Sequence, residues 1–160
     1  MNKRSLFALV IFILSTEAVG MLGALATTPN IATWYAGLVK PMLTPPGWVF
    51  GPVWVTLYLL MGIAMFLVWR RRGIGSRRDW WLARIFYSVQ LMLNLLWSIV
   101  FFGLHNSSGG LGVIATLWML ILLTIIFFGR VSRAAAWLLV PYIVWVSFAM
   151  YLNLGIWLCN

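Results

Sequence analysis

The chain has 160 residues, of which 64% are hydrophobic and 8% are charged, and its mean hydropathy is +1.01. Soluble domains are about half apolar and about a quarter charged, so this composition excludes an ordinary soluble protein. The net charge of +9 does not indicate nucleic acid binding, because the basic residues cluster in short segments between apolar runs. One cysteine, one histidine and two acids are too few for an internal disulfide, a metal site or a conventional hydrolytic centre.

Apolar runs long enough to cross a bilayer, which takes about 20 residues, recur along the chain. Each must be helical in lipid, because every backbone polar group there needs an internal partner. The sequence therefore predicts an all-α membrane protein: a single domain over 1–160, formed by one bundle of five transmembrane helices. The expected helices lie near 5–26, 48–69, 80–103, 111–129 and 134–158.

The first run begins after Lys3 and Arg4 and could be read as a signal peptide. We interpret it as a membrane helix, because it is longer than a typical signal-peptide core and contains Glu17. A charge near the bilayer centre costs roughly 2.5–3.5 kcal/mol on insertion scales. Glu17 is therefore either a ligand or proton contact, or a neutral acid bonded to a neighbour, and the sequence leaves both open.

The segment between the first two runs, residues 34–54, is rich in aromatic residues and proline, whereas loops between membrane helices are usually short and polar. Tryptophan and tyrosine favour the membrane–water interface, and proline restricts the backbone on both sides of its peptide bond. These properties predict a stiff aromatic lid over the helix bundle, suited to covering a flat, greasy ligand.

Aromatic and amide residues recur at helical spacing on three of the expected helices, and amides in a membrane segment face the bundle interior. Together they predict an apolar pocket with a few polar anchors, the usual composition of a small-molecule site. The alternative is that the aromatic stripes only pack and the amides only join helices. The three faces are Phe50, Trp54 and Tyr58; Gln90, Asn94, Trp97 and Phe101; and Tyr142, Trp145, Ala149 and Leu152.

The distribution of cations predicts the orientation in the membrane. With five crossings, the basic segments 3–4, 70–78 and 130–133 fall on one side, and Lys40 falls on the other. The positive-inside rule then places the N-terminus in the cytoplasm and the C-terminus and the aromatic loop outside.

The motifs resemble those of the TspO/translocator-protein family, which includes bacterial tryptophan-rich sensory proteins and the mitochondrial peripheral benzodiazepine receptor. The resemblance covers nearly the whole chain. It rests on Trp34-Tyr35, Lys40-Pro41, Pro45-Pro46 and Trp48-Val49-Phe50-Gly51-Pro52-Val53-Trp54; on Gln90, Asn94, Trp97 and Phe101-Phe102-Gly103; and on Pro141-Tyr142, Trp145, Phe148-Ala149 and Leu152-Asn153.

The resemblance implies a homodimeric five-helix bundle whose loop roofs a pocket for tetrapyrroles such as porphyrin and haem, for sterols and for benzodiazepine-type ligands. It implies no metal and no obligatory cofactor, with porphyrin as a ligand and membrane lipid as the surroundings. Leu43 stands where many members have an aromatic residue, and no basic residue follows Tyr151, so the sterol-recognition pattern is incomplete. The ligand-binding positions that carry over are Trp34, Tyr35, Phe50, Trp54, Asn94, Trp97, Trp145, Ala149 and Leu152.

The function expected first is that of a membrane receptor or sensor that binds tetrapyrroles, with a regulatory or transport role. A second hypothesis is a light-dependent, porphyrin-degrading enzyme with Trp54 and Trp145 as redox-active side chains, and a third is a membrane scaffold. An apolar run that starts at Ser5, without a transit-like leader, favours a bacterial plasma membrane over a mitochondrial outer membrane.

Overall fold

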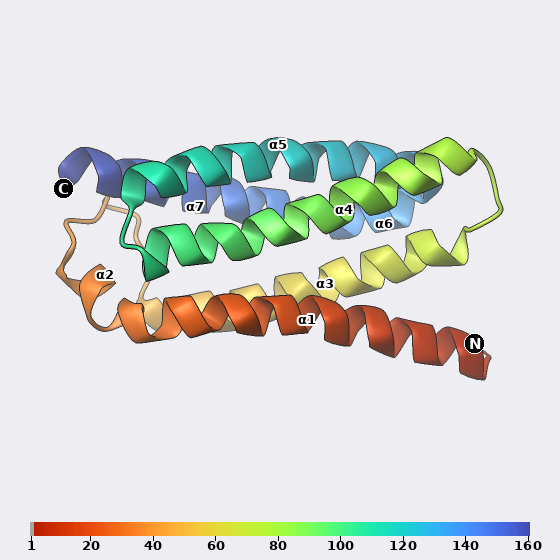
Figure 1. Ribbon diagram of the computed structural model, residues 1–160, viewed down its shortest axis with the longest axis horizontal. Coiled ribbons are helices and arrows are strands. Elements are labelled where there is room, and N and C mark those ends of the chain that lie inside the picture. Colours follow the sequence, from red (N-terminus) through yellow and green to blue (C-terminus); the bar gives the residue numbers. More distant parts are fainter. Residues whose placement is uncertain (1) are drawn as a thin grey trace.

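The fold is a bundle of five membrane-spanning helical segments. The computed structural model describes residues 2–160, and no strand occurs among them. The segments run side by side along the long axis, with the two chain ends at opposite ends of the bundle (Figure 1). The predicted all-α membrane fold is confirmed. The elements are α1 (Lys3–Ile31), α2 (Trp34–Gly37), η1 (Gly47–Val49), α3 (Phe50–Arg70), α4 (Arg77–Ser98), η2 (Ile99–Gly103), α5 (Ser107–Val131), α6 (Arg133–Leu138) and α7 (Val140–Cys159).

Several helices begin before the apolar runs that predict them, because polar side chains cap their first turns. Asn2, Ser76 and Asn106 each accept a hydrogen bond from a backbone N–H in the first turn of α1, α4 and α5. The fifth span is divided at Leu139 into α6 and α7. Pro141 occupies the first turn of α7, where its missing N–H is tolerated.

Two glycines allow α1 and α3 to pack closely. A Cβ atom on Gly62 would lie 2.8 Å from the Cα atom of Ile13, and a Cβ on Gly20 would collide with the Tyr58 ring. Small residues allow this approach, which is a common way for membrane helices to associate. Closer to the aromatic loop, α1 faces the first turns of α3 across a groove.

A polar network in the core joins α3, α4 and α7. The Asn94 side chain is 1% exposed; its amide oxygen accepts a hydrogen bond from the Tyr58 hydroxyl, and its amide nitrogen donates to the Tyr142 hydroxyl at 3.0 Å. Tyr142 in turn donates to the Gln90 side-chain oxygen at 2.9 Å. Both amides therefore face inward, and they hold three helices in register.

The loop between α1 and α3 is fixed to the end of the bundle. The Trp34 indole stacks on the His105 ring with centroids 4.5 Å apart, and His105 Nε2 lies 2.8 Å from the side-chain oxygen of Asn30. The Asn160 side chain forms two hydrogen bonds with the backbone of Val39, at 3.1 Å and 3.0 Å. The lid is thus fastened to the turn before α5 and to the end of α7.

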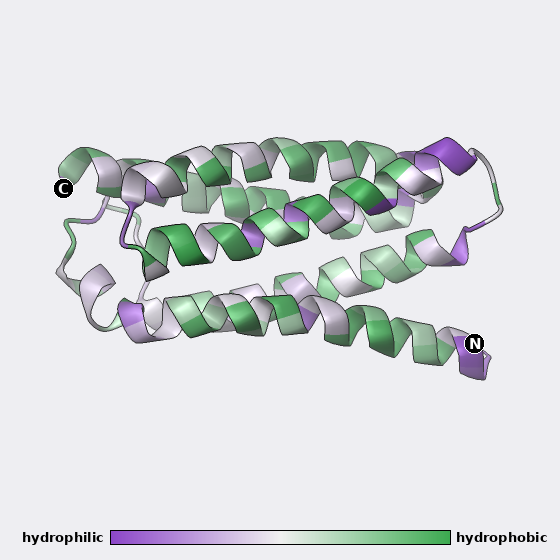
Figure 2. Cartoon of the chain, viewed as in Figure 1, coloured by the Kyte–Doolittle hydropathy of each residue, from purple (hydrophilic) through white to green (hydrophobic). Residues whose placement is uncertain are grey.

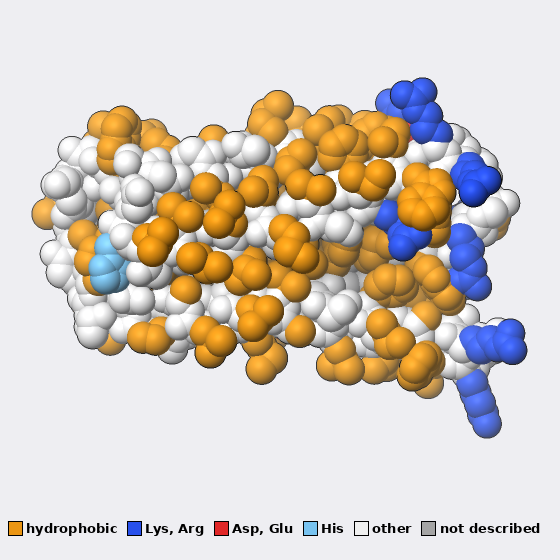
Figure 3. Space-filling model, viewed as in Figure 1, with side chains coloured by type: hydrophobic (Ala, Val, Ile, Leu, Met, Phe, Trp, Pro, Cys, Tyr) orange, Lys and Arg blue, Asp and Glu red, His pale blue; other side chains and the backbone are white. Residues whose placement is uncertain are grey.

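The charge distribution is strongly asymmetric. The Lys and Arg side chains gather at the end of the bundle that holds the N-terminus and the turn between α3 and α4 (Figure 3), and hydrophobic residues predominate along the helices between the two ends (Figure 2). Lys40 instead lies in the loop at the opposite end, where its ammonium donates to the carbonyl oxygens of Ala36 and Leu38. Asp79 forms an ion pair with Arg130 at 3.3 Å at the basic end.

Candidate functional site

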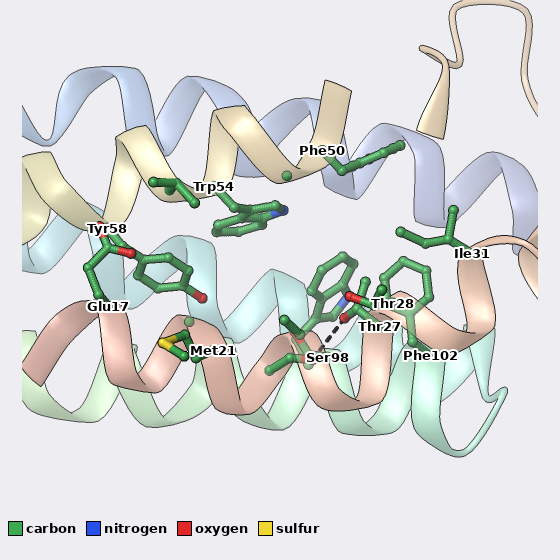
Figure 4. A pocket seen from close by; sticks show the side chains of 16 residues that line it. Glu17, Met21, Thr27, Thr28, Ile31, Phe50, Trp54, Tyr58, Ser98 and Phe102 are labelled. Atoms are coloured by element: carbon green, nitrogen blue, oxygen red, sulfur yellow. Dashed lines mark hydrogen bonds between the residues drawn. The ribbon is translucent and has the colours of Figure 1, made fainter. Parts of the chain in front are cut away.

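A groove of about 180 Å³ lies between α1 and α3, with α4 and η2 as its floor (Figure 4). Its wall is mostly hydrocarbon and aromatic, with a carboxyl group and hydroxyl groups among it. The lining residues are Glu17, Gly20, Met21, Gly23, Ala24, Thr27, Thr28, Ile31, Phe50, Gly51, Trp54, Val55, Tyr58, Trp97, Ser98 and Phe102.

Trp54 is the centre of the aromatic wall. Its ring stacks on Tyr58 at a centroid distance of 5.6 Å and lies 6.5 Å from Trp97. Phe50 extends this wall by one helical turn toward the loop, where Phe102 faces it (Figure 4). Such rings present flat apolar faces that favour stacked or edge-on aromatic partners.

The α1 side of the groove is formed by small residues. Gly23 packs closely on Ser98, and the Thr27 hydroxyl donates to the Gly23 carbonyl at 3.0 Å, so that hydroxyl is already bonded within its own helix. At the mouth, Met21 is 71% exposed and Val55 is 58% exposed. Because both lie on the flank of membrane-spanning helices, the groove opens toward lipid.

Glu17 lies at the inner end of the groove, beside Tyr58 and opposite the end formed by Ile31 and Phe102 (Figure 4). It is half-buried. Within residues 2–160 its carboxyl group makes no hydrogen bond and no ion pair. The groove therefore contains a polar group in the middle of a membrane helix that the described residues leave without a partner.

The structure brings three of the nine predicted site residues into the groove wall: Phe50, Trp54 and Trp97. The other six do not line it: Trp34, Tyr35, Asn94, Trp145, Ala149 and Leu152. Direct contact with a ligand stays a prediction for all nine.

Tyr35 and Trp145 support the groove from behind. The Tyr35 ring contacts Phe50 and Phe102 at centroid distances of 6.1 Å and 5.7 Å. Burial raises the pKa of the Tyr35 hydroxyl to about 12. Trp145 contacts Phe50 at 6.0 Å, and its buried indole N–H has no acceptor among residues 2–160.

The α1 face of the groove was not predicted as a unit, although Glu17 was considered as a ligand contact. The signal was present: Glu17, Gly20, Ala24, Thr27 and Ile31 follow one another at steps of three or four residues. That spacing places them on one side of a helix. Small and polar residues on a lipid-facing helix mark a face that does not serve lipid contact alone.

The fold and groove define a multi-pass α-helical membrane protein with an aromatic site open to the bilayer. The TspO/MBR family model matches residues 12–158, and the chain belongs to this family. It is 42% identical over 156 residues to a tryptophan-rich protein TspO of Archaeoglobus fulgidus, covering 98% of this chain and 99% of the relative. It is 44% identical over 161 residues to a tryptophan-rich protein TspO of Chlorobaculum tepidum, covering 98% and 97%. It is 39% identical over 127 residues to the translocator protein of Homo sapiens, covering 79% and 75%.

Proposed function

We propose that this chain is a membrane receptor or sensor that binds tetrapyrroles and similar flat hydrophobic ligands in the groove, with a regulatory or transport role. The observation that carries the proposal is the Trp54 indole, which lines the groove between Tyr58 and Trp97. A conjugated macrocycle would stack on this wall and bury apolar area from both partners.

The size and opening of the groove support a ligand that is only partly enclosed. Sites for drug-sized molecules usually measure about 300–1,000 Å³, more than the roughly 180 Å³ found here. A tetrapyrrole would therefore place one edge against Trp54 and extend its other edge between Met21 and Val55 into the lipid. This arrangement suits a ligand that arrives by diffusion within the bilayer.

Quenching of tryptophan fluorescence by protoporphyrin, with the protein in phosphatidylcholine nanodiscs, tests the proposal. Trp54→Ala should raise the Kd about tenfold, because an aromatic pair contributes about 0.5–1.5 kcal/mol beyond the area it buries. Trp137→Ala is the matched control, since Trp137 is 73% exposed on α6 and does not line the groove. Equal affinity of both variants and the wild type would contradict the assignment.

Asn94→Ala in the same assay tests whether the amide orients the ligand. Asn94 does not line the groove, but its side-chain oxygen accepts a hydrogen bond from the hydroxyl of Tyr58, which does. Asn94 can therefore affect the ligand by holding the Tyr58 ring in position. A loss of affinity in Trp54→Ala but not in Asn94→Ala would assign binding to the aromatic wall and leave the amide a role in packing.

The orientation in the membrane belongs to the same proposal: a cytoplasmic N-terminus, an outward C-terminus and a bacterial plasma membrane. The basic end of the bundle supports it (Figure 3). Cys159 is exposed at the end of α7 and is the single cysteine of the chain. A membrane-impermeant maleimide should therefore label Cys159 in intact bacterial cells that express the protein. Labelling only after lysis would show that the orientation is the opposite one.

We further propose that the chain forms a homodimer and needs no obligatory cofactor, as the family resemblance implies. The measurement is the mass of the protein purified in detergent without added porphyrin. A folded dimer free of bound pigment is the expected species, and a monomer across the working range of concentration would refute the dimer.

A further inference from the structure

We infer that Glu17 binds a protonated amine, so that the groove prefers flat hydrophobic ligands that carry one cationic nitrogen. The inference rests on the proposed function, because it assigns the ligand class of the same groove. It depends on three observations: where Glu17 lies along α1, what surrounds its carboxyl group, and where that carboxyl group lies relative to the aromatic wall of the groove.

Glu17 is the middle residue of α1, which runs from Lys3 to Ile31. At 1.5 Å per residue it lies about 21 Å from either end of the helix. A glutamate side chain is too short to bring its carboxyl group to either membrane surface from there. Because an acid at this depth is unfavourable unless it has a partner, intramembrane acids usually mark sites of function.

No group of the described protein neutralises or bonds this carboxyl. The basic residues lie at the ends of the bundle, and the ion pair found among residues 2–160 joins Asp79 to Arg130. Tyr58 lines the groove next to Glu17, and its hydroxyl donates to Asn94. The neighbouring Thr16 hydroxyl donates to the Phe12 carbonyl and bonds Tyr87. These hydroxyl groups are thus already engaged, and Glu17 lines the cavity.

The charged group of the groove lies at one end, whereas hydroxyl groups of Thr27, Thr28 and Ser98 lie among the aromatic and aliphatic residues farther along. Glu17 is at one end, Trp54 is in the middle, and Ile31, Phe50 and Phe102 form the other end (Figure 4). A complementary ligand therefore has a nitrogen donor at one end and a flat ring system next to it. An ammonium on a carboxylate makes charge-assisted hydrogen bonds, which are stronger than neutral ones and stronger still away from water.

The same carboxyl group fixes the orientation of an acidic ligand. A porphyrin carries its propionates on one edge, and two carboxylates within a membrane groove repel each other. The propionate edge would therefore turn away from Glu17, and the opposite, apolar edge would lie nearest to it.

Two probes of the same shape separate the charge from the ring system. 9-(Aminomethyl)anthracene is a primary ammonium near neutral pH, and 9-ethylanthracene is its neutral counterpart. Binding to the full chain in uncharged phosphatidylcholine nanodiscs is followed by energy transfer from tryptophan to anthracene. We expect the wild type to bind the amine at least tenfold more tightly than the neutral probe, a ratio that corresponds to one charge-assisted hydrogen bond.

Glu17→Gln should abolish this preference, so that the two probes bind with similar affinity; binding of 9-ethylanthracene by the variant also shows that it is folded. Asp79→Asn is the matched control, because it removes the other acid of the chain, outside the groove, and should keep the preference. If both probes bind and Glu17→Gln keeps the wild-type ratio of the two affinities, the proposed role of Glu17 is wrong. The groove would then still be a binding site for flat hydrophobic ligands. If neither probe binds the wild type, the proposed groove function fails together with the inference.

Discussion

The close contact between α1 and α3 predicts that Gly62→Ala destabilises the bundle. The new Cβ atom would lie 2.8 Å from the Ile13 Cα atom and 3.0 Å from the Phe12 carbonyl oxygen, where ordinary contacts begin at 3.4 Å. Both obstacles are backbone, so the helices must separate by about 0.6 Å instead of moving a side chain. Overpacking of this kind costs about 1–3 kcal/mol.

Alanine is also a better helix former than glycine by about 1 kcal/mol, and this gain partly offsets the clash. Gly112→Ala isolates the two effects, because Gly112 lies in α5 with open space where its Cβ atom would be. The free energy of unfolding, measured by titration with sodium dodecyl sulfate in mixed micelles, should therefore differ between the two variants by about 1–3 kcal/mol, with Gly62→Ala the less stable. Equal stabilities would refute the close α1–α3 packing.

Three further predictions concern the network, the lid and its tyrosine. Tyr58→Phe removes the donor to Asn94 and should lower the free energy of unfolding by about 1 kcal/mol in the same titration. An unchanged free energy of unfolding would show that this hydrogen bond does not stabilise the bundle. His105→Ala removes the ring stacked on Trp34 and should speed hydrogen exchange across residues 32–46, whereas an unchanged rate would show that the stack does not hold the lid. The raised pKa of Tyr35 means that the unfolded chain ionises first, so stability present below pH 10 should fall between pH 10 and about pH 12; Tyr35→Phe should lose less over that interval.

The inward faces of α3, α4 and α7 could be predicted from the sequence, because exposing a polar side chain to lipid is energetically unfavourable. An amide in lipid must find a partner, so Gln90 and Asn94 determine which side of α4 faces the core. Trp97 is carried inward on the same side of the helix. The tyrosines that complete the network, Tyr58 on α3 and Tyr142 on α7, lie on the faces that helical spacing also predicted to point inward.

The packing face of α1 could not be predicted from amides in this way, because apolar residues occur on every side of this helix and the signal of its groove face is a row of small and polar residues. The buried residues of this 29-residue helix are Thr16 and Gly23, and neither is a large hydrophobic residue. A search for a periodic hydrophobic stripe therefore does not find the side of α1 that contacts the bundle. Its position depends on Gly62, which lies on another helix and has no side chain from which a partner could be read. The helix ends were missed for a different reason, since capping side chains lie outside the apolar runs that define a span.

The groove lies beside α1, which makes few hydrogen bonds to the other elements. Among residues 2–160, side chains of α1 bond other elements at two points, Thr16 with Tyr87 and Asn30 with His105. In lipid, helix association depends on close packing and on such bonds, because there is no water to drive apolar surfaces together. Between these two bonds, α1 is held chiefly by small-residue contacts, and this stretch is the one that faces the cavity. A ligand that enters from the bilayer would therefore displace α1 at lower cost than any helix of the Tyr58–Asn94–Tyr142 network, and the Glu17 carboxyl moves with the helix that yields.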